Sequence, residues 1–509
     1  METKTAAIEM RNITKRFGPV LANDKVWLNI YRGEILALLG ENGSGKTTLM
    51  NMLSGIYFPD EGEIKIDGKE VVIRPPKDAF DNGIGMIHQH FKLVDVLTAA
   101  ENIVLGLPGK LDLKAASAKI REICDKYGFS VDPAQKIYDM SVSQKQTVEI
   151  VKVLYRGADI LILDEPTAVL TPQETDKLFA VLRNMRNDGK AIVIITHKMH
   201  EVEALSDRVA ILRHGQFIGD MLTAHTNAQE MTNMMVGHAV SLNIERPDPV
   251  DPKPRIEVKG LTVRSVDGIV KLDDVSFTAN SGEILGIAGI SGCGQKELLE
   301  AIAGLQTVES GSISYIEDDG SREELIGKDP LSIAELGVSL SFVPEDRLGM
   351  GLVGNMNLAD NMMLRSFRRG KSIFTDRRSP RALAESVVQE LSVSTPSVDT
   401  PVRRLSGGNV QKVLVGREIA SAPTVLLTAY AVRGLDIHSS YTIYDLINRQ
   451  KKAGVAVIFV GEDLDVLLEL CDRILVLCGG KVSGIVSGRG AEKREVGMMM
   501  TKLGGQSHE

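Results

Sequence analysis

One short stretch of the sequence can bind phosphate. Residues 40–47 read GENGSGKT, which fits the pattern GxxxxGK[ST], and they follow the strand-like run EILALL. The loop glycines allow backbone N–H groups to turn toward phosphate oxygens, and the Lys46 ammonium can reach the β and γ phosphates. The Thr47 hydroxyl is a ligand that Mg²⁺ accepts. The stretch therefore predicts a site for a nucleoside triphosphate with its metal ion.

A second candidate group follows the apolar run ILIL. Asp164 suits Mg²⁺, which prefers carboxylate and water oxygens, and Glu165 can polarise a water molecule for attack on the γ phosphate. Acidic residues at such a place can also cap the next helix, but the phosphate loop upstream favours the chemical reading. Gln89, on a predicted loop, and His197, at the end of AIVIIT, are weaker candidates, because a lone histidine at a strand end is more often structural.

The sequence contains an internal repeat. GEILALLG at residues 33–40 returns as GEILGIAG at residues 282–289, an offset of 289 − 40 = 249. Further on, ADILILDEP from residue 158 faces PTVLLTAYA from residue 423, an offset of 423 − 158 = 265. The second phosphate loop reads GISGCGQKE, so Gln295 replaces the lysine and Lys296 replaces the hydroxyl. One copy of the loop is intact and the other is altered.

The repeat and the apolar patterning predict the fold. Short apolar runs alternate with longer stretches of helical periodicity, the pattern of an α/β protein with a mainly parallel sheet and covering helices. The segment RPDPVDPKP between the copies favours an extended connector. We expect a first domain at residues 1–245, a proline-rich linker at 246–255 and a second domain at 256–509.

Composition narrows the class of partner. The 509 residues carry a net charge of −8 and the sequence pI is about 5.7, so no overall charge favours nucleic acid or an anionic lipid surface. The four cysteines lack metal-ligand spacing, which favours reduced thiols in a cytosolic protein. No leader-like segment and no window of ~18 to 20 apolar residues occur, so a membrane role is expected to be peripheral.

Together, the motifs resemble those of the nucleotide-binding subunits of ABC transporters. The resemblance rests on the phosphate loop, on Gln89, on LDEP at residues 163–166, on His197 and on the signature LSGGN at residues 405–409. HQHFKLV, EPTAVLTPQE and LSGGNVQK look like the tandem ATPases of bacterial importers for monosaccharides and nucleosides, and HQHF and GCGQ lean toward the nucleoside branch. The resemblance implies two tandem ABC-type P-loop NTPase domains, each with a helical subdomain.

The resemblance also implies which residues form the site. ATP and Mg²⁺ are the expected ligands, and each ATP is expected between the phosphate loop of one domain and the signature of the other. The implied catalytic residues are Glu165, His197 and Gln89, and the implied metal ligands are Thr47, Gln89 and Asp164. The implied nucleotide-binding residues are Phe17, which would stack on adenine, Gly40, Glu41, Asn42, Gly43, Ser44, Gly45, Lys46, Thr47, Thr48, Ser406, Gly407, Gly408 and Asn409.

Each expected ATP site combines the phosphate loop of one domain with the signature of the other. Almost all departures from the family pattern fall on one of these two sites. The site built on the first loop departs from the family only at Asn409, where glutamine is usual. The other site loses every catalytic group: it combines Gln295, Lys296, Glu345, Ala429, Tyr430, Glu462 and Val266 with the altered signature Met140-Ser141-Val142-Ser143-Gln144. We expect hydrolysis at the first site alone. The second either holds nucleotide without Mg²⁺, with Lys296 supplying the charge, or stays empty.

The sequence thus predicts the ATP-hydrolysing, energy-coupling subunit of an ABC importer for nucleosides or simple sugars. The resemblance implies two transmembrane permease subunits and an extracytoplasmic solute-binding protein as partners, with this chain peripheral at the cytoplasmic face of the membrane. The alternative is a tandem ABC protein without membrane partners that acts on ribosomes or nucleic acid, which the short proline-rich linker and the acidic charge disfavour. The transported solute, hydrolysis by the isolated chain and the copy number in the transporter are left open.

Overall fold

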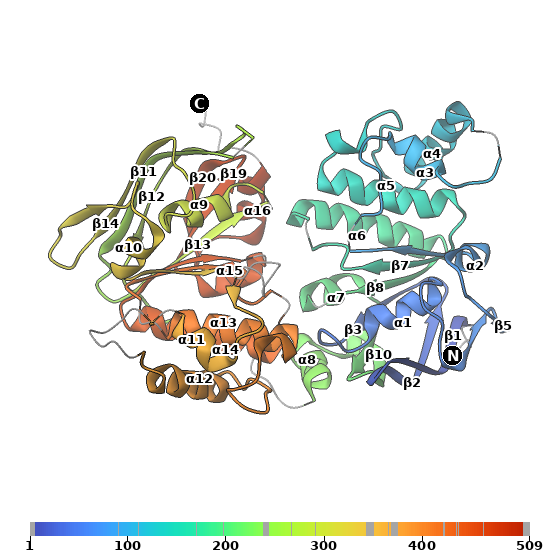
Figure 1. Ribbon diagram of the computed structural model, residues 1–509. Helices are drawn as coiled ribbons and strands as arrows, with labels where there is room; N and C mark the ends of the chain where they lie inside the picture. Colours follow the sequence, from blue (N-terminus) through green and yellow to red (C-terminus); the bar gives the residue numbers. More distant parts are fainter. Residues whose placement is uncertain are drawn as a thin grey trace. The chain divides into compact units, whose positions relative to one another are not determined.

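The chain forms two compact units, assigned to Met1–Ser241 and Leu242–Glu509 (Figure 1). The computed structural model describes residues 6–501 except 90, 110, 169, 197, 238–243, 266, 291, 343–350, 365, 368–374, 421–422, 434, 436 and 462.

A mainly parallel sheet runs through the first unit, as predicted. In the described residues it has six strands in the order β10-β9-β3-β8-β7-β6, parallel from β9 to β6, with β10 antiparallel at the edge. Every residue of β3, β7 and β8 is buried, which explains why these strands read as continuous apolar runs. The bounds are β3 Glu34–Leu39, β6 Ile84–Ile87, β7 Ile160–Asp164, β8 Ala191–Ile195, β9 Arg208–Arg213 and β10 Gln216–Leu222.

The second unit repeats this sheet. Its described strands follow the order β16-β17-β18-β13-β19-β20, again with only the last pair antiparallel. The bounds are β13 Ile284–Gly289, β16 Val338–Phe342, β17 Val425–Ala429, β18 Ala456–Val460, β19 Arg473–Cys478 and β20 Lys481–Ser487. The internal repeat of the sequence is therefore a repeat of architecture.

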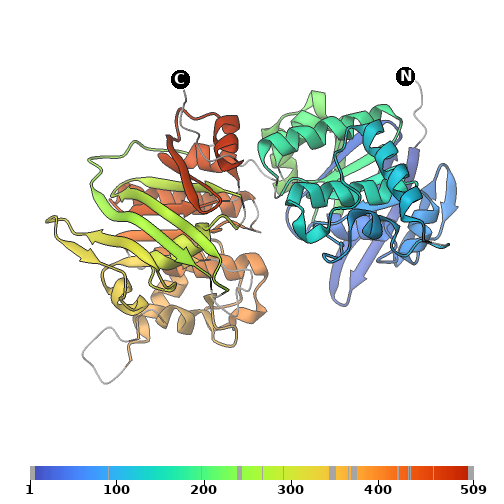
Figure 2. The same cartoon turned by 90° about the horizontal axis from the view of Figure 1, so that it is seen from above.

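Each unit also contains an antiparallel sheet that the sequence analysis did not anticipate. The orders are β2-β1-β4-β5 and β12-β11-β14-β15, and Figure 2 shows the second of these in green to yellow. Trp27 is half exposed on β2 between buried Val26 and Leu28, so the alternation of this strand is masked by an apolar residue on its outer face. The bounds are β1 Ala6–Phe17, β2 Val20–Tyr31, β4 Glu61–Ile66, β5 Lys69–Val71, β11 Pro254–Arg264, β12 Val270–Asn280, β14 Ser310–Ile316 and β15 Arg322–Glu324.

Helices cover the sheets and form a separate helical region in each unit. In the first unit, α3, α4 and α5 gather at one end (Figure 1) around a hydrophobic cluster of their own. The bounds are α1 Lys46–Leu53, α2 Pro76–Asp81, α3 Ala99–Val104, α4 Leu113–Tyr127, α5 Val142–Tyr155, α6 Pro172–Asn187, α7 Met199–Leu205 and α8 Ala228–Val236, with 3-10 turns at Ile137–Asp139 and Thr223–His225. The predicted helical subdomain is present.

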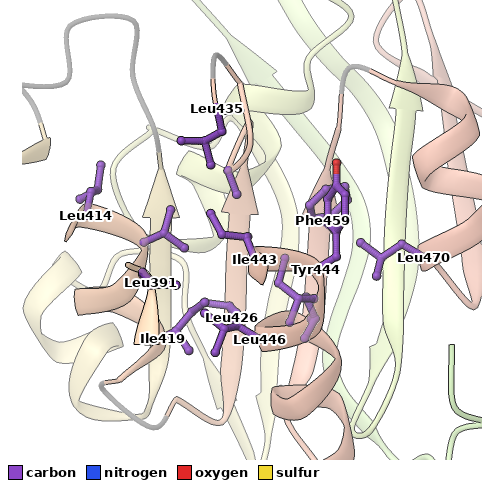
Figure 3. Packing of buried hydrophobic residues seen from close by; sticks show 14 of the residues in the cluster. Leu391, Leu414, Ile419, Leu426, Leu435, Ile443, Tyr444, Leu446, Phe459 and Leu470 are labelled. Carbon is purple, nitrogen blue, oxygen red and sulfur yellow. The ribbon is translucent and has the colours of Figure 1, made fainter. Parts of the chain in front are cut away.

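In the second unit, α11 and α12 lie beside α13, and their side chains join the core of the sheet. Figure 3 shows this cluster, in which Leu391 and Leu414 belong to the helical side while Leu426 and Phe459 come from the strands. The bounds are α9 Gln295–Ile302, α10 Pro330–Glu335, α11 Leu358–Met363, α12 Arg378–Glu390, α13 Gly407–Ile419, α14 Ile437–Lys452, α15 Leu464–Leu470 and α16 Lys493–Thr501, with a 3-10 turn at Val402–Arg404. One continuous core supports both regions.

The proline-rich segment has neither helix nor strand until β11 begins, and it is bonded to the second unit. Arg246 donates from Nη1 to the carbonyls of Leu468 and Cys471, both at 2.7 Å. Lys451 donates to the carbonyl of Pro247. The segment therefore follows the surface of the second unit. The limits expected from the sequence, 1–245, 246–255 and 256–509, stay a prediction.

Candidate functional site

The phosphate loop joins the buried strand β3 to helix α1. Gly45, at the N-cap of α1, has φ 95°, in the left-handed region that favours glycine. A side chain at Gly40 would place its Cβ 2.3 Å from the carbonyl oxygen of Leu212. No side chain caps the N-terminus of α1 in the described residues, and Asn42 and Gly43 are exposed. The loop thus offers the amide-lined turn that phosphate requires.

Lys46 closes this loop from inside. Its Nζ donates to the carbonyl oxygens of Gly40 at 2.6 Å and Glu41 at 2.9 Å, and the residue is 9% exposed. Burial lowers the pKa of Lys46, against the nearby carboxylates of Glu165 and Asp164, which raise it. Ser44 is buried and Thr48 partly buried beside it. The ammonium thus bonds the carbonyl oxygens of its own loop, and phosphate oxygens would be alternative acceptors for it.

A hydroxyl and a carboxylate meet next to the lysine. Thr47 donates from Oγ1 to Oδ2 of Asp164, at 3.3 Å. Asp164 ends β7 and is 8% exposed. Burial raises the pKa of the Asp164 carboxyl and the neighbouring Glu165 adds to this, while the hydrogen bond from Thr47 and the charge of Lys46 oppose it. Two hard oxygen ligands therefore lie within reach of one cation.

Glu165 turns out of the sheet directly after β7. Its φ is 46°, unusual for a residue with a side chain, and its N–H donates to the carbonyl of Ile195 on β8 at 2.8 Å. Gln89, two residues after the neighbouring strand β6, donates from Nε2 to Oε2 of Glu165 at 2.9 Å. Lys46, Thr47, Gln89, Asp164 and Glu165 are thus brought together in one unit, although 119 residues (165 − 46) separate the first from the last in the chain.

Phe17 lies at the surface rather than in the core. It ends β1, is 41% exposed, and meets Tyr57 edge to face with ring centroids 5.1 Å apart. The Lys15 ammonium lies 5.6 Å from the centroid of the Phe17 ring. The ring contact with Tyr57 is not apparent from the sequence, because the two residues are 40 positions apart (57 − 17).

The signature residues of the second unit begin helix α13. Ser406 is the N-cap, and its Oγ accepts from the Asn409 backbone N at 3.4 Å and from Asn409 Nδ2 at 2.9 Å. Asn409 also accepts from the Ser394 N–H at 3.0 Å, so the residue that departs from the family has a structural partner. Gly407 and Gly408 form the first turn. In the first unit, Ser141 caps α5 in the same way, with Gln144 as its capping-box partner.

The second phosphate loop keeps the left-handed glycine at the N-terminus of its helix but lacks the lysine. Gly294 caps α9 with φ 98°, and Gln295, 5% exposed, donates from Nε2 to the carbonyl of Ile290 at 3.3 Å. This position matches that of Lys46, which bonds the equivalent loop carbonyl. Lys296 Nζ lies 3.6 Å from Oε1 of Glu300, one turn further along the helix.

The two acidic positions of the second unit are also lost on an unchanged scaffold. Ala429 is fully buried at the end of β17. Tyr430 has φ 55° and donates from N–H to the carbonyl of Val460 at 3.0 Å, the counterpart of the bond between Glu165 and Ile195. Four residues named from the sequence, His197, Val266, Glu345 and Glu462, lie outside the described residues.

Comparison with known proteins identifies the family. The family described as ABC transporter matches residues 23–168 and 272–428, which is most of the chain in two segments. The chain belongs to the ABC transporter family. It is therefore an ATPase, and it carries two ABC units in tandem.

The related proteins match this ABC transporter subunit from end to end. A nucleoside import ATP-binding protein of Lactococcus lactis is 42% identical over 99% of both chains. A guanosine import ATP-binding protein of Bacillus subtilis is 40% identical over 97% of both, and a glucose import ATP-binding protein of Haloferax volcanii is 39% identical over 98% of this chain and 96% of its own. The chain is accordingly the energy-coupling subunit of an ABC importer, and the reading as a tandem ABC protein acting on ribosomes or nucleic acid is not favoured.

Proposed function

We propose that this subunit hydrolyses ATP at the phosphate loop of its first unit alone and that this drives import of a nucleoside. The observation that carries the single-site proposal is the contrast between two matching backbones. Asp164 and Glu165 stand where the second unit has Ala429 and Tyr430. Asp164 and Ala429 end equivalent strands, and Glu165 and Tyr430 follow directly after them. One unit holds the groups that hydrolysis needs, and the other holds their positions without them.

The residues of the first unit fit MgATP. The loop amides and Lys46 would bind phosphate oxygens, and Thr47 and Asp164, with Gln89, would hold Mg²⁺, since hydroxyl, carboxylate and amide oxygens suit this ion. When bound, Mg²⁺ neutralises charge on the phosphates. Glu165 acts as the general base that accepts a proton from the attacking water, and Gln89, hydrogen-bonded to it, orients its carboxylate.

Residues beyond this cluster complete the site. We assign Phe17 to adenine, because the residue is 41% exposed and an aromatic ring tolerates a flat base. Ser406, Gly407, Gly408 and Asn409 supply a helix N-terminus that suits the γ phosphate. His197 keeps the catalytic role that the family resemblance implies for it. Association of this signature with the first loop is part of the proposal, as are the domain limits 1–245 and 256–509.

The solute is proposed from the relatives and from the sequence. Two of the three relatives named above carry a nucleoside in their names, one of them guanosine. The expected partners are two permease subunits and an extracytoplasmic solute-binding protein, with the chain peripheral at the cytoplasmic face. In the described part of the chain, no helix combines the length and the apolar character needed to cross a bilayer.

Uptake by cells tests this function with a matched pair of variants. Lys46→Ala and Gln295→Ala change equivalent positions of the two loops, both buried. Cells lacking the chromosomal copy and carrying each variant are given labelled guanosine or ribose. We expect Lys46→Ala to abolish guanosine uptake, Gln295→Ala to spare it, and ribose uptake to be unaffected by either. An equal loss of guanosine uptake in both variants would contradict the single-site proposal. Loss of ribose uptake in Lys46→Ala would show that the subunit serves ribose import and would contradict the proposed nucleoside.

A further inference from the structure

A largely buried polar cluster follows the ends of β7 and β8, and its residues have no role in the functions assigned above. It consists of Thr167, Thr196, Lys198 and Glu201, and three of these, Thr167, Thr196 and Glu201, are at most 3% exposed. The Glu201 carboxylate accepts from Thr167 Oγ1 at 2.5 Å and from Thr196 Oγ1 at 3.1 Å. Lys198 Nζ lies 3.3 Å from Glu201 Oε1 and donates to the Thr167 carbonyl at 3.2 Å. One carboxylate thus gathers three groups from two segments.

These segments border the proposed catalytic residues. Thr167 is two residues beyond Glu165. Thr196 and Lys198 are the chain neighbours of His197 on either side. Glu201 lies in the first turn of α7 and so joins the end of β7 to the end of β8 through side chains.

The equivalent positions of the second unit carry other residues. At the offset of 265, its residues are Val432, Gly461, Asp463 and Val466. Val432 and Val466 are partly buried and pack against the hydrophobic cluster of that unit. Asp463 instead caps α15, accepting from the Asp465 N–H at 2.9 Å.

The two units share a backbone hydrogen bond at this corner but differ in the side chains around it. The backbone link between adjacent strand ends is present in both units, from Glu165 to Ile195 and from Tyr430 to Val460. A carboxylate at the position of Glu201 is therefore not needed to form this backbone link, since Val466 occupies the equivalent position of the second unit. A buried carboxylate with three partners costs desolvation that valine avoids, so its presence in the first unit calls for a reason other than stability.

We propose that Glu201 is a positioning residue for ATP hydrolysis, which fixes Thr196 and Lys198 relative to Thr167. The inference rests on the proposed roles of Glu165 and His197. Hydrogen bonds to a charged group in a low-dielectric interior are short and directional. They hold the two strand ends in one register, whereas apolar packing tolerates small displacements. Since a misplacement of about 1 Å can cost about 100-fold in rate, such a brace acts on turnover rather than on nucleotide affinity.

A graft of the second unit's residues tests the proposal. The variant T167V/T196G/K198D/E201V gives the first unit the set that the second unit already folds with. ATP turnover is measured on the full chain in membrane vesicles from cells that express the transporter, and MgATP binding on the purified chain. We expect the melting temperature and the KM for ATP to stay close to wild type while kcat falls about 10- to 100-fold. The reverse exchange, V432T/V466E, is expected to leave kcat unchanged.

The outcomes separate this proposal from the proposed function. A graft whose kcat stays within about threefold of wild type, or whose KM rises with kcat unchanged, overturns the positioning role. Glu165→Gln is measured alongside: if it still turns over ATP, the assignment of the base is wrong, whatever the graft does. Should the graft fail to fold, Thr167→Val alone decides, because it removes one hydroxyl at constant volume. It should lower kcat at least about threefold with binding retained, and unchanged kcat overturns the proposal.

Discussion

Replacing Glu165 with glutamine removes one negative charge from the end of β7 and leaves the shape of the side chain almost unchanged. Gln89 donates to Oε2 of Glu165 at 2.9 Å, and the amide oxygen of glutamine can accept the same bond. The backbone bond from residue 165 to Ile195 does not involve the side chain. Fold and MgATP affinity should therefore persist. Loss of a general base typically lowers turnover about 10²- to 10⁴-fold, or roughly 2.7 to 5.4 kcal/mol at 1.36 kcal/mol per tenfold.

Tyr430→Phe is the matched control for this prediction. Tyr430 occupies the equivalent position of the second unit, with φ 55° and the corresponding bond to Val460. ATP turnover in membrane vesicles and equilibrium binding of MgATP are measured for both variants. Glu165→Gln should bind with wild-type affinity and turn over at most about 1% as fast, and Tyr430→Phe should match wild type in both. Turnover above about a tenth of wild type in Glu165→Gln, or a comparable loss in Tyr430→Phe, would refute the reasoning.

Three further predictions concern other parts of the chain. Gly408→Asp should keep MgATP binding and abolish turnover. The variant should fold, because the nearest atom to a Cβ at this position is Leu435 Cδ2 at 3.7 Å. Normal turnover would exclude the signature from the active site. Nucleotide that still binds to Lys46→Ala should bind equally in Mg²⁺ and in EDTA, because Lys296 replaces the metal-binding hydroxyl, and a requirement for Mg²⁺ would contradict this. Arg208→Met should lower the free energy of unfolding by about 3 to 5 kcal/mol, because it leaves the buried Glu34 carboxylate without its partner at 2.7 Å; urea denaturation measures this, and a loss below about 1 kcal/mol would contradict it.

The parallel sheets and the phosphate loop could be predicted because their signals are local. A strand buried on both faces, such as β7, must be apolar throughout, and the loop glycines are required by a left-handed turn. In the first antiparallel sheet, Trp27 breaks the alternation of β2. In the second, β11 and β12 do alternate buried apolar with more exposed polar residues, so this sheet was missed although its signal is present in the sequence. The cluster around Glu201 gives no local signal, since Thr167 lies 34 residues away in the chain.

The bond from Gln89 to Glu165 was equally hidden from the sequence. Each residue was named separately, as a metal ligand or a base, and only the pairing of β6 with β7 brings them together. Their relation depends on the order of strands in the sheet, and that order is fixed by packing over the whole unit.

The left-handed backbone at Glu165 and Tyr430 has a consequence for how the second unit, which we propose to be inactive, could change. A side-chain-bearing residue in this conformation costs about 1 to 3 kcal/mol, and the second unit still bears that cost at a tyrosine that has no base chemistry to perform. The bend is therefore a property of the strand crossover, inherited whether or not a reaction follows. A glutamate introduced at Tyr430 would therefore enter a backbone conformation that already matches that of Glu165. Restoring a general base to the second unit would require substitution of side chains but no change of this turn.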